Sequence, residues 1–244
     1  MSPEIEKLIK EEGWEQKIKN KISNEEFEKI LIQFKGNKKA FKQAWENKGG
    51  TNAEKVFDII LEHHQKPHRA YHNITHVSHM LDGLNNSEDI AEDKTAIKIA
   101  IWFHDAIYDP TKKDNEEKSA ELAYNQCIDN GILEEESQKI KKLILATKHS
   151  TTPQTNDEKI IADLDLVVLG LDLKTFKIYS EALRKEYDFV GEVQYWKNRK
   201  IVFERFLEQE KLFYTEFFKE KYEKQALKNI EWGIIDAENH ISRA

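Results

Sequence analysis

Apolar residues recur at helical spacing along most of the 244-residue chain, and nowhere do they alternate with polar residues as in a half-buried strand. Glycine, proline or asparagine stands where most of these segments end, which indicates short loops between helices. The pattern therefore predicts an all-α protein. Its expected helices lie near residues 53–64, 74–84, 94–104, 115–130, 134–149, 158–169, 174–188, 192–208 and 215–231.

The first 50 residues have the same helical periodicity but carry no recognisable chemistry. Gly36-Asn37 is expected to end a first helical stretch, and a second short helix is expected to hold Phe41, Ala44 and Trp45 before Gly49-Gly50 breaks it. We interpret residues 1–50 as a helical accessory segment.

Charge and cysteine content narrow the classes of function. The formal net charge is −7, and lysine and glutamate are interspersed, so the chain lacks the basic face that nonspecific binding of nucleic acid requires. Cys127 is the sole cysteine, which excludes an intrachain disulfide and agrees with a reducing compartment. No signal peptide or long apolar stretch is evident, so we expect a cytoplasmic protein without a membrane span.

Histidine and aspartate gather in two short motifs. His72 and His76 are four residues apart, which would place both on one face of a helix. His104-Asp105 follows an apolar helical run in which residues 97, 100 and 101 share the face of His104. Imidazole nitrogens beside carboxylate oxygens suit divalent metals such as Zn, Mn, Fe or Co. The sequence therefore predicts a metal site between two helices.

These motifs have an order and spacing that resemble a known family. The set comprises Arg69-x-Tyr-His-Asn73, Trp102-Phe-His-Asp-x-x-Tyr-Asp109, Asn115-Glu-x-x-Ser-Ala120 and Asp163-x-Asp-Leu-x-x-Leu-Gly170. It is similar to a group of bacterial predicted hydrolases in the HD superfamily of metal-dependent phosphohydrolases, and Tyr71-His72-Asn73-x-x-His76 also resembles the cyclic-nucleotide phosphodiesterases. The resemblance covers roughly residues 53–170. It implies an HD-type helical bundle at 51–173, with residues 174–244 as a helical extension packed on it.

The resemblance also implies a set of metal ligands: His76, His104, Asp105 and either Asp163 or Asp165. Asp165 is favoured because an apolar run follows it at residues 167–169, as the family pattern expects. Asp163 would then support the ligands or have a structural role, and Asp109 is expected in the same supporting layer. Two imidazoles and two carboxylates would leave positions on the metal for water and a phosphate oxygen.

Further residues receive roles by the same comparison, each with a simpler alternative. His72 would be the general acid that protonates the leaving group, or would only hydrogen-bond a ligand. His149 would bind a second metal or phosphate, or be a solvated histidine at a helix end. Arg69 would clamp phosphate, or form a surface salt bridge. Glu116 would be a general base or support a ligand, or only complement a helix dipole. Asp105 would also orient the attacking water.

The expected function is therefore hydrolysis of a phosphate ester of a small molecule, with a nucleotide among the candidates, by metal-activated water. The cofactor would be one or two divalent ions from Mn, Fe, Co, Ni, Zn and Mg. A di-iron HD-type oxygenase and a ligand-binding module without turnover are the alternatives. The aromatic-rich C-terminal helices leave a homodimer as an option, and the family resemblance indicates a reaction class but no particular substrate.

Overall fold

The computed structural model describes residues 24–243, and within that range the chain forms helices joined by loops, with no strand. This confirms the predicted all-α class. The chain divides into two compact units, Met1–Ala40 and Phe41–Ala244, and the second unit holds every residue of the candidate site. Helical structure expected before residue 24 lies outside the described residues. The domain boundaries expected at 50/51 and 173/174 stay predictions.

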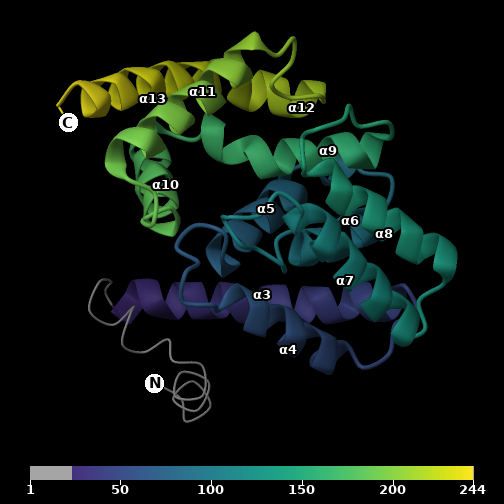
Figure 1. Cartoon of the computed structure of the whole chain (residues 1–244). Coiled ribbons are helices and arrows are strands. Elements are labelled where there is room, and N and C mark those ends of the chain that lie inside the picture. The colour runs from purple at the N-terminus through teal and green to yellow at the C-terminus, as the bar shows by residue number, and fades with distance from the viewer. Residues whose placement is uncertain (1–23, 244) are drawn as a thin grey trace. The chain divides into compact units, whose positions relative to one another are not determined.

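The described helices follow one another with short connections (Figure 1). They are α3 Asn24–Asn47, α4 Ala53–His64, α5 Ile74–Asn86, α6 Lys94–Phe103, α7 Asn115–Asp129, α8 Glu134–Ala146, α9 Asn156–Leu166, α10 Leu173–Glu186, α11 Glu192–Glu208, α12 Glu216–Phe218 and α13 Lys224–Arg243. Short 3₁₀ turns stand at Glu88–Ile90 and Val167–Gly170, which we call η1 and η2, and a π-helical turn, η3, at Lys219–Glu223.

The predicted helix end at Gly36-Asn37 is wrong. Helix α3 continues through Gly36 to Asn47 and stops before Gly49, whose φ of 84° lies in the left-handed region that favours glycine. A glycine inside a helix costs only about 1 kcal/mol relative to alanine, so it does not by itself end a helix. The burial of Phe41 and Trp45 on the last turns of α3 gives a physical reason for the helix to continue.

Two other helix ends also differ from the prediction. Helix α8 ends at Ala146, so His149 stands beyond the helix instead of in its last turn. The helix expected at 215–231 is divided into α12, a π-helical turn and α13, which continues to Arg243. The sequence pattern found apolar faces correctly but not the local turns that interrupt them.

Helix α6 is the centre of the unit that begins at Phe41. Its residues from Ala96 to Phe103 are apolar on almost every side, as in a helix surrounded by other helices. It contacts α5, α7, α8 and α9. At its C-terminal end, the Trp102 ring lies against Phe57, with ring centroids 4.9 Å apart, and Phe41 packs beside both. This packing fixes the end of α6, where His104 follows.

The C-terminal helices are tied to the segment that carries Asp165. Helices α11 and α13 lie side by side (Figure 1), and Gly233 of α13 faces the ring of Phe203 so closely that a Cβ would lie 2.4 Å from it. On α13, the buried Asn229 donates from Nδ2 to the carbonyl oxygens of Leu169 and Leu171, at 2.8 and 2.7 Å. The turn that follows α9 is therefore held by α13.

None of the helices in the range 24–243 combines the length and the apolar content needed to cross a bilayer.

Candidate metal centre

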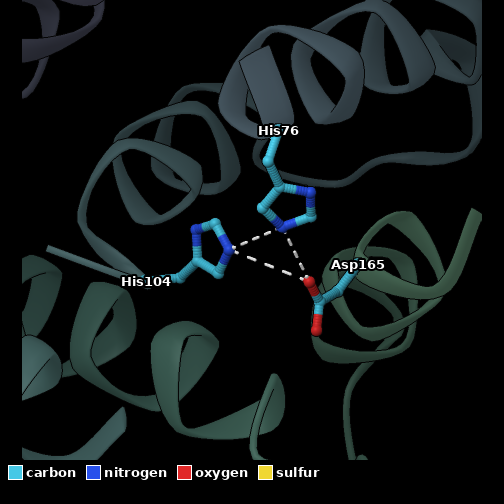
Figure 2. Close-up of side chains that lie close together, drawn as sticks. All are labelled: His76, His104 and Asp165. Carbon is cyan, nitrogen blue, oxygen red and sulfur yellow. Dashed lines mark hydrogen bonds and ion pairs between the residues drawn. The ribbon is translucent and has the colours of Figure 1, made fainter. Parts of the chain in front are cut away.

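Three side chains from three different elements converge in the interior (Figure 2). His76 lies on α5, His104 directly follows α6, and Asp165 lies on α9. The Nε2 atoms of the two histidines are 3.1 Å apart, and Oδ1 of Asp165 lies 3.1 Å from Nε2 of His76 and 3.8 Å from Nε2 of His104. These donor atoms lie within 4.8 Å of one another, so the cluster could hold a metal ion.

His104 is oriented by the helix that precedes it. Its Nδ1 donates a hydrogen bond of 2.7 Å to the carbonyl oxygen of Ile101, so Nε2 is the atom that faces the cluster. A backbone carbonyl in this position is a common means of fixing a metal-binding imidazole. Burial disfavours the charged ring, but the carboxylates of Asp105 and Asp165 outweigh burial and raise the pKa of His104 to about 9. The surroundings of this ring therefore favour a positive charge.

Asp105 adds a fourth donor beside the cluster. Its Oδ2 lies 3.0 Å from Nε2 of His104 and 3.9 Å from Nε2 of His76. Burial alone would raise the pKa of this carboxyl, but the charges of His104, His72 and His76 hold it well below its usual range. Asp105 is thus a buried, ionised carboxylate, which is the form that binds a cation.

The choice between Asp163 and Asp165 is clear in the structure. Asp165 reaches the cluster, and its Oδ2 accepts a hydrogen bond of 2.9 Å from Nε2 of His149. Asp163, two residues earlier, points to the C-terminal region instead. It accepts hydrogen bonds from the backbone N–H groups of Tyr214 and Thr215 and from Oγ1 of Thr215. Asp163 therefore has a structural role, which is one of the two roles expected for it from the sequence.

Replacement of Asp163 by alanine is expected to destabilise the fold rather than to remove a ligand. Asp163 is fully buried, and its loss would leave the N–H groups of Tyr214 and Thr215 without a partner. We expect a cost of about 3 kcal/mol, seen as a decrease of roughly 6–12 °C in Tm. Asp172→Ala, which removes an exposed cap from Thr175, should cost only about 1 kcal/mol. Equal losses in the two variants would contradict this role.

His149 lies next to the cluster in an unusual backbone conformation. Its φ is 52°, which is rare for a residue other than glycine, and its ring donates to Asp165 as described above. The interpretation as a solvated helix-end histidine is therefore incomplete, because the ring contacts a candidate ligand. Its role toward a second metal or phosphate stays a prediction.

His72 does not share a helix face with His76, because α5 begins only at Ile74. The side chain of Asn73 accepts a hydrogen bond from the N–H of Thr75 and caps the helix there. His72 thus lies in the loop before the cap, yet its ring centroid is 6.1 Å from that of His76. The prediction that His72 and His76 share one helix face is therefore wrong, although the two rings do lie close together.

Sequence reasoning missed Glu186, which holds His72 in place. This buried carboxylate at the end of α10 accepts a 2.6 Å hydrogen bond from Nδ1 of His72 and two more from the N–H groups of Tyr71 and His72. Burial disfavours a charged ring, but Asp105 and Glu186 outweigh it and raise the pKa of His72. Burial alone would raise the pKa of Glu186, but the same hydrogen bonds and the charge of His72 lower it. Nothing in the local sequence at residue 186 indicates this contact.

Arg69 is buried and braces the loops of the site, so it forms no surface salt bridge. Its Nη1 donates to the carbonyl oxygens of His72 and Asp105, and its Nη2 donates to that of Ala106. Burial lowers the pKa of Arg69 from its usual range. Both terminal nitrogens are bonded to backbone, so the guanidinium positions the two histidine motifs, while its buried Nε has no partner in the described part of the chain. The expected role of Arg69 as a phosphate clamp stays a prediction.

The loop after His104 is held by α7. The Asn115 side chain bonds to both the N–H and the carbonyl of Asp109, and the hydroxyl of Ser119 does the same for Ile107. The Asp109 carboxylate accepts hydrogen bonds from Thr111 and so closes a local turn. Asp109 was expected instead to support the metal ligands. The Asn-Glu-x-x-Ser motif thus has a structural explanation.

Glu116 lies half-buried in the first turn of α7. Burial raises the pKa of its carboxyl, and the negative charge of Asp105 adds to that shift. The two carboxyl groups of Glu116 and Asp105 therefore interact electrostatically. Its expected role as a base or as a supporting group stays a prediction.

A cavity of about 170 Å³ opens beside the cluster. It is lined by Tyr71, His72, His149, Asp165, Leu166, Val168, Leu169, Phe176, Tyr179, Ser180, Leu183, Arg199 and Phe206. A second cavity of about 150 Å³ borders His76 and Asp165 from another side. The first cavity is the one that contains His72, so a ligand there would contact both the candidate acid and the cluster.

The donor set fits a divalent metal. Two imidazoles and two carboxylates are suitable for Zn, Mn, Fe or Co. A cation bound here would replace the proton that the neighbouring carboxylates favour on His104, because an imidazole binds a metal in its neutral form. The mixture does not select one of these ions. Comparison with known proteins adds no constraint: no family model, no curated protein and no solved structure matches this chain.

Proposed function

We propose that the protein is a divalent-metal-dependent phosphohydrolase of the HD superfamily that cleaves a phosphate ester of a small molecule. One observation carries this proposal: the His76, His104 and Asp165 cluster lies beside Asp105 and borders a cavity that also contains His72. A cation site and a proton donor facing one cavity are the two parts that hydrolysis of a phosphate ester requires.

The four donors would hold the cation through Nε2 of His76 and His104 and through carboxylate oxygens of Asp105 and Asp165. A bound divalent cation would supply Lewis acidity toward a phosphoryl oxygen and would lower the pKa of water. Asp105 keeps its ligand position because Arg69 holds its carbonyl. His149 holds the other oxygen of Asp165 and restricts the orientation of that carboxylate.

His72 has the environment of a general acid. Its Nδ1 is bonded to Glu186, which leaves Nε2 as the atom able to transfer a proton to the leaving oxygen. The Tyr108 ring lies against it at a tilt, with centroids 4.0 Å apart, and limits its rotation. Burial opposes a charged ring, but Asp105 and Glu186 outweigh it and raise the pKa of His72, which favours the protonated form that can protonate the leaving oxygen.

The proposal is tested with purified full-length protein in a phosphate-release screen over nucleotides, sugar phosphates and other small phosphate esters. Each reaction is run as purified, after removal of metals with a chelator, and after addition of Mn²⁺, Co²⁺, Ni²⁺, Zn²⁺, Fe²⁺ or Mg²⁺. We expect release of phosphate that the chelator abolishes and at least one metal restores.

Oxygen consumption with Fe²⁺ is measured in parallel. Release of phosphate that is insensitive to the chelator would contradict the assigned centre. Substrate-dependent oxygen uptake without phosphate release would favour the di-iron oxygenase instead. Tight binding of a phosphate ester without turnover would favour a ligand-binding module.

A further inference from the structure

Arg199 stands on the inward face of α11, where a cation is uncommon. Tyr195 and Phe203, four residues to either side, are both buried, and Phe206 lines the same cavity as Arg199. The guanidinium carbon lies 4.2 Å from the centroid of the Phe203 ring. Within residues 24–243, no hydrogen bond or carboxylate partner is found for this guanidinium. Arg199 is only partly exposed, and an arginine in such a position usually has a partner, so its charge calls for an explanation.

Two other arginines of this region have hydrogen-bond acceptors for their guanidinium groups. Arg69 donates to three backbone carbonyls. Arg184 of α10 bonds to Glu192 and to the carbonyl oxygens of Tyr187 and Val190. Both guanidinium groups are therefore engaged in holding the fold. Arg199 instead has its described contact with the face of the Phe203 ring, which attracts a cation but offers no acceptor to the N–H donors.

The position of Arg199 links it to the metal centre. It shares the cavity of about 170 Å³ with His72, His149 and Asp165. Tyr71 lines that cavity too, and its ring centroid is 5.1 Å from that of His76. A ligand that fills the cavity would thus meet the candidate acid, a candidate metal ligand and an unpaired guanidinium together.

We propose that Arg199 binds the phosphate oxygens of the substrate, and that the substrate is a compact phosphate ester with a largely apolar remainder. This inference rests on the proposed function for its substrate class. The planar fork of arginine matches two phosphate oxygens, and the absence of a described carboxylate partner leaves that fork available.

The remaining wall supports the second half of the proposal. It is formed mainly by Leu166, Val168, Leu169, Phe176, Leu183 and Phe206. Pockets that enclose a drug-sized ligand usually measure about 300–1,000 Å³, so this cavity accommodates a phosphate and a small organic group but not an enclosed nucleotide. Small phosphate esters should be better substrates than nucleotides.

The test is binding of inorganic phosphate to full-length protein, measured by calorimetry without added metal and again with Mn²⁺. Arg199→Met should weaken binding by about 10- to 100-fold in any state in which the wild-type protein binds phosphate. Arg205→Met is the matched control, because Arg205 lies on the same helix but is exposed and outside the cavity. It should bind phosphate as the wild-type protein does.

Arg199→Lys provides a second variant that keeps the charge but not the fork. We expect an intermediate loss of phosphate affinity. If Arg199→Met does not fold, the phosphate affinity of Arg199→Lys tests the role of Arg199 instead. In steady-state assays with the best ester, Arg199→Met should raise KM more than it lowers kcat.

The outcomes separate this inference from the proposed function. Unchanged phosphate affinity in Arg199→Met would overturn the role of Arg199, even if metal-dependent hydrolysis is found. Failure of the wild-type protein to bind phosphate in either state would overturn it as well. Arg199-dependent binding without any hydrolysis would retain the anion site and reject the enzyme. Preference for nucleotides over small esters would reject the compact substrate.

Discussion

His104→Ala is expected to lower metal-dependent phosphate release by at least about 1,000-fold, because it removes a candidate ligand whose Nε2 lies 3.1 Å from that of His76. The cation contributes several kcal/mol of charge stabilisation to such a reaction, and each 1.36 kcal/mol is a factor of ten in rate. The metal content of the purified variant should fall together with its rate. Both quantities are measured on the same preparation, by elemental analysis and by phosphate release.

His240→Ala is the matched control for this substitution. His240 lies near the end of α13, half-exposed, where its ring stacks on Trp196 and belongs to no part of the candidate site. Its removal should leave metal content and rate unchanged. A His104→Ala protein that folds and still releases phosphate at more than about a tenth of the wild-type rate would show that the centre is not catalytic.

His72→Asn is expected to produce the second largest loss, and the size of that loss should depend on the leaving group. General acid catalysis contributes about 10²–10⁴-fold, so alkyl phosphates, whose leaving oxygen needs a proton, should be slowed to that extent. An aryl ester such as p-nitrophenyl phosphate releases p-nitrophenolate, which leaves without protonation, so hydrolysis of this ester should be slowed far less. The measurement is kcat/KM for both ester types in the wild-type and variant proteins.

Glu186→Gln tests the same claim through the residue that orients His72. The amide keeps the shape of the side chain but loses the charge that holds Nδ1 of His72 at 2.6 Å. We expect a smaller loss with the same preference for alkyl over aryl esters. Equal losses on both ester types in His72→Asn would indicate that His72 binds substrate and does not donate the proton.

The residues of the site that could be predicted from the sequence are those whose local helical pattern indicates their position. His76 follows a helix start, and His104 follows the apolar run of α6, so their proximity needed only two helices packed together. Asp165 was favoured over Asp163 because of the apolar residues that follow it, and the structure places Asp165 in the cluster. The all-α class followed from hydrophobic spacing alone, which is the most reliable signal in a single sequence.

The parts that depend on tertiary packing were not predictable. Glu186 contacts His72 from 114 positions away, and neither segment contains a signal for the other. Arg69 would satisfy either a phosphate or backbone carbonyls, and only the folded loop shows that carbonyls surround it. Gly36 failed as a helix end because local propensity yields to the burial of Phe41 and Trp45 nearby.

The existence of the metal centre itself is tested most directly by titrating chelator-treated protein with Co²⁺ and following its visible absorption. The wild-type protein should bind about one equivalent in the core site, with a spectrum typical of nitrogen and oxygen ligands. The double variant His76→Ala/Asp165→Ala, checked for helical content by circular dichroism, should show no such spectrum. Absence of binding in the wild-type protein, or an unchanged spectrum in the folded double variant, would contradict the assigned centre.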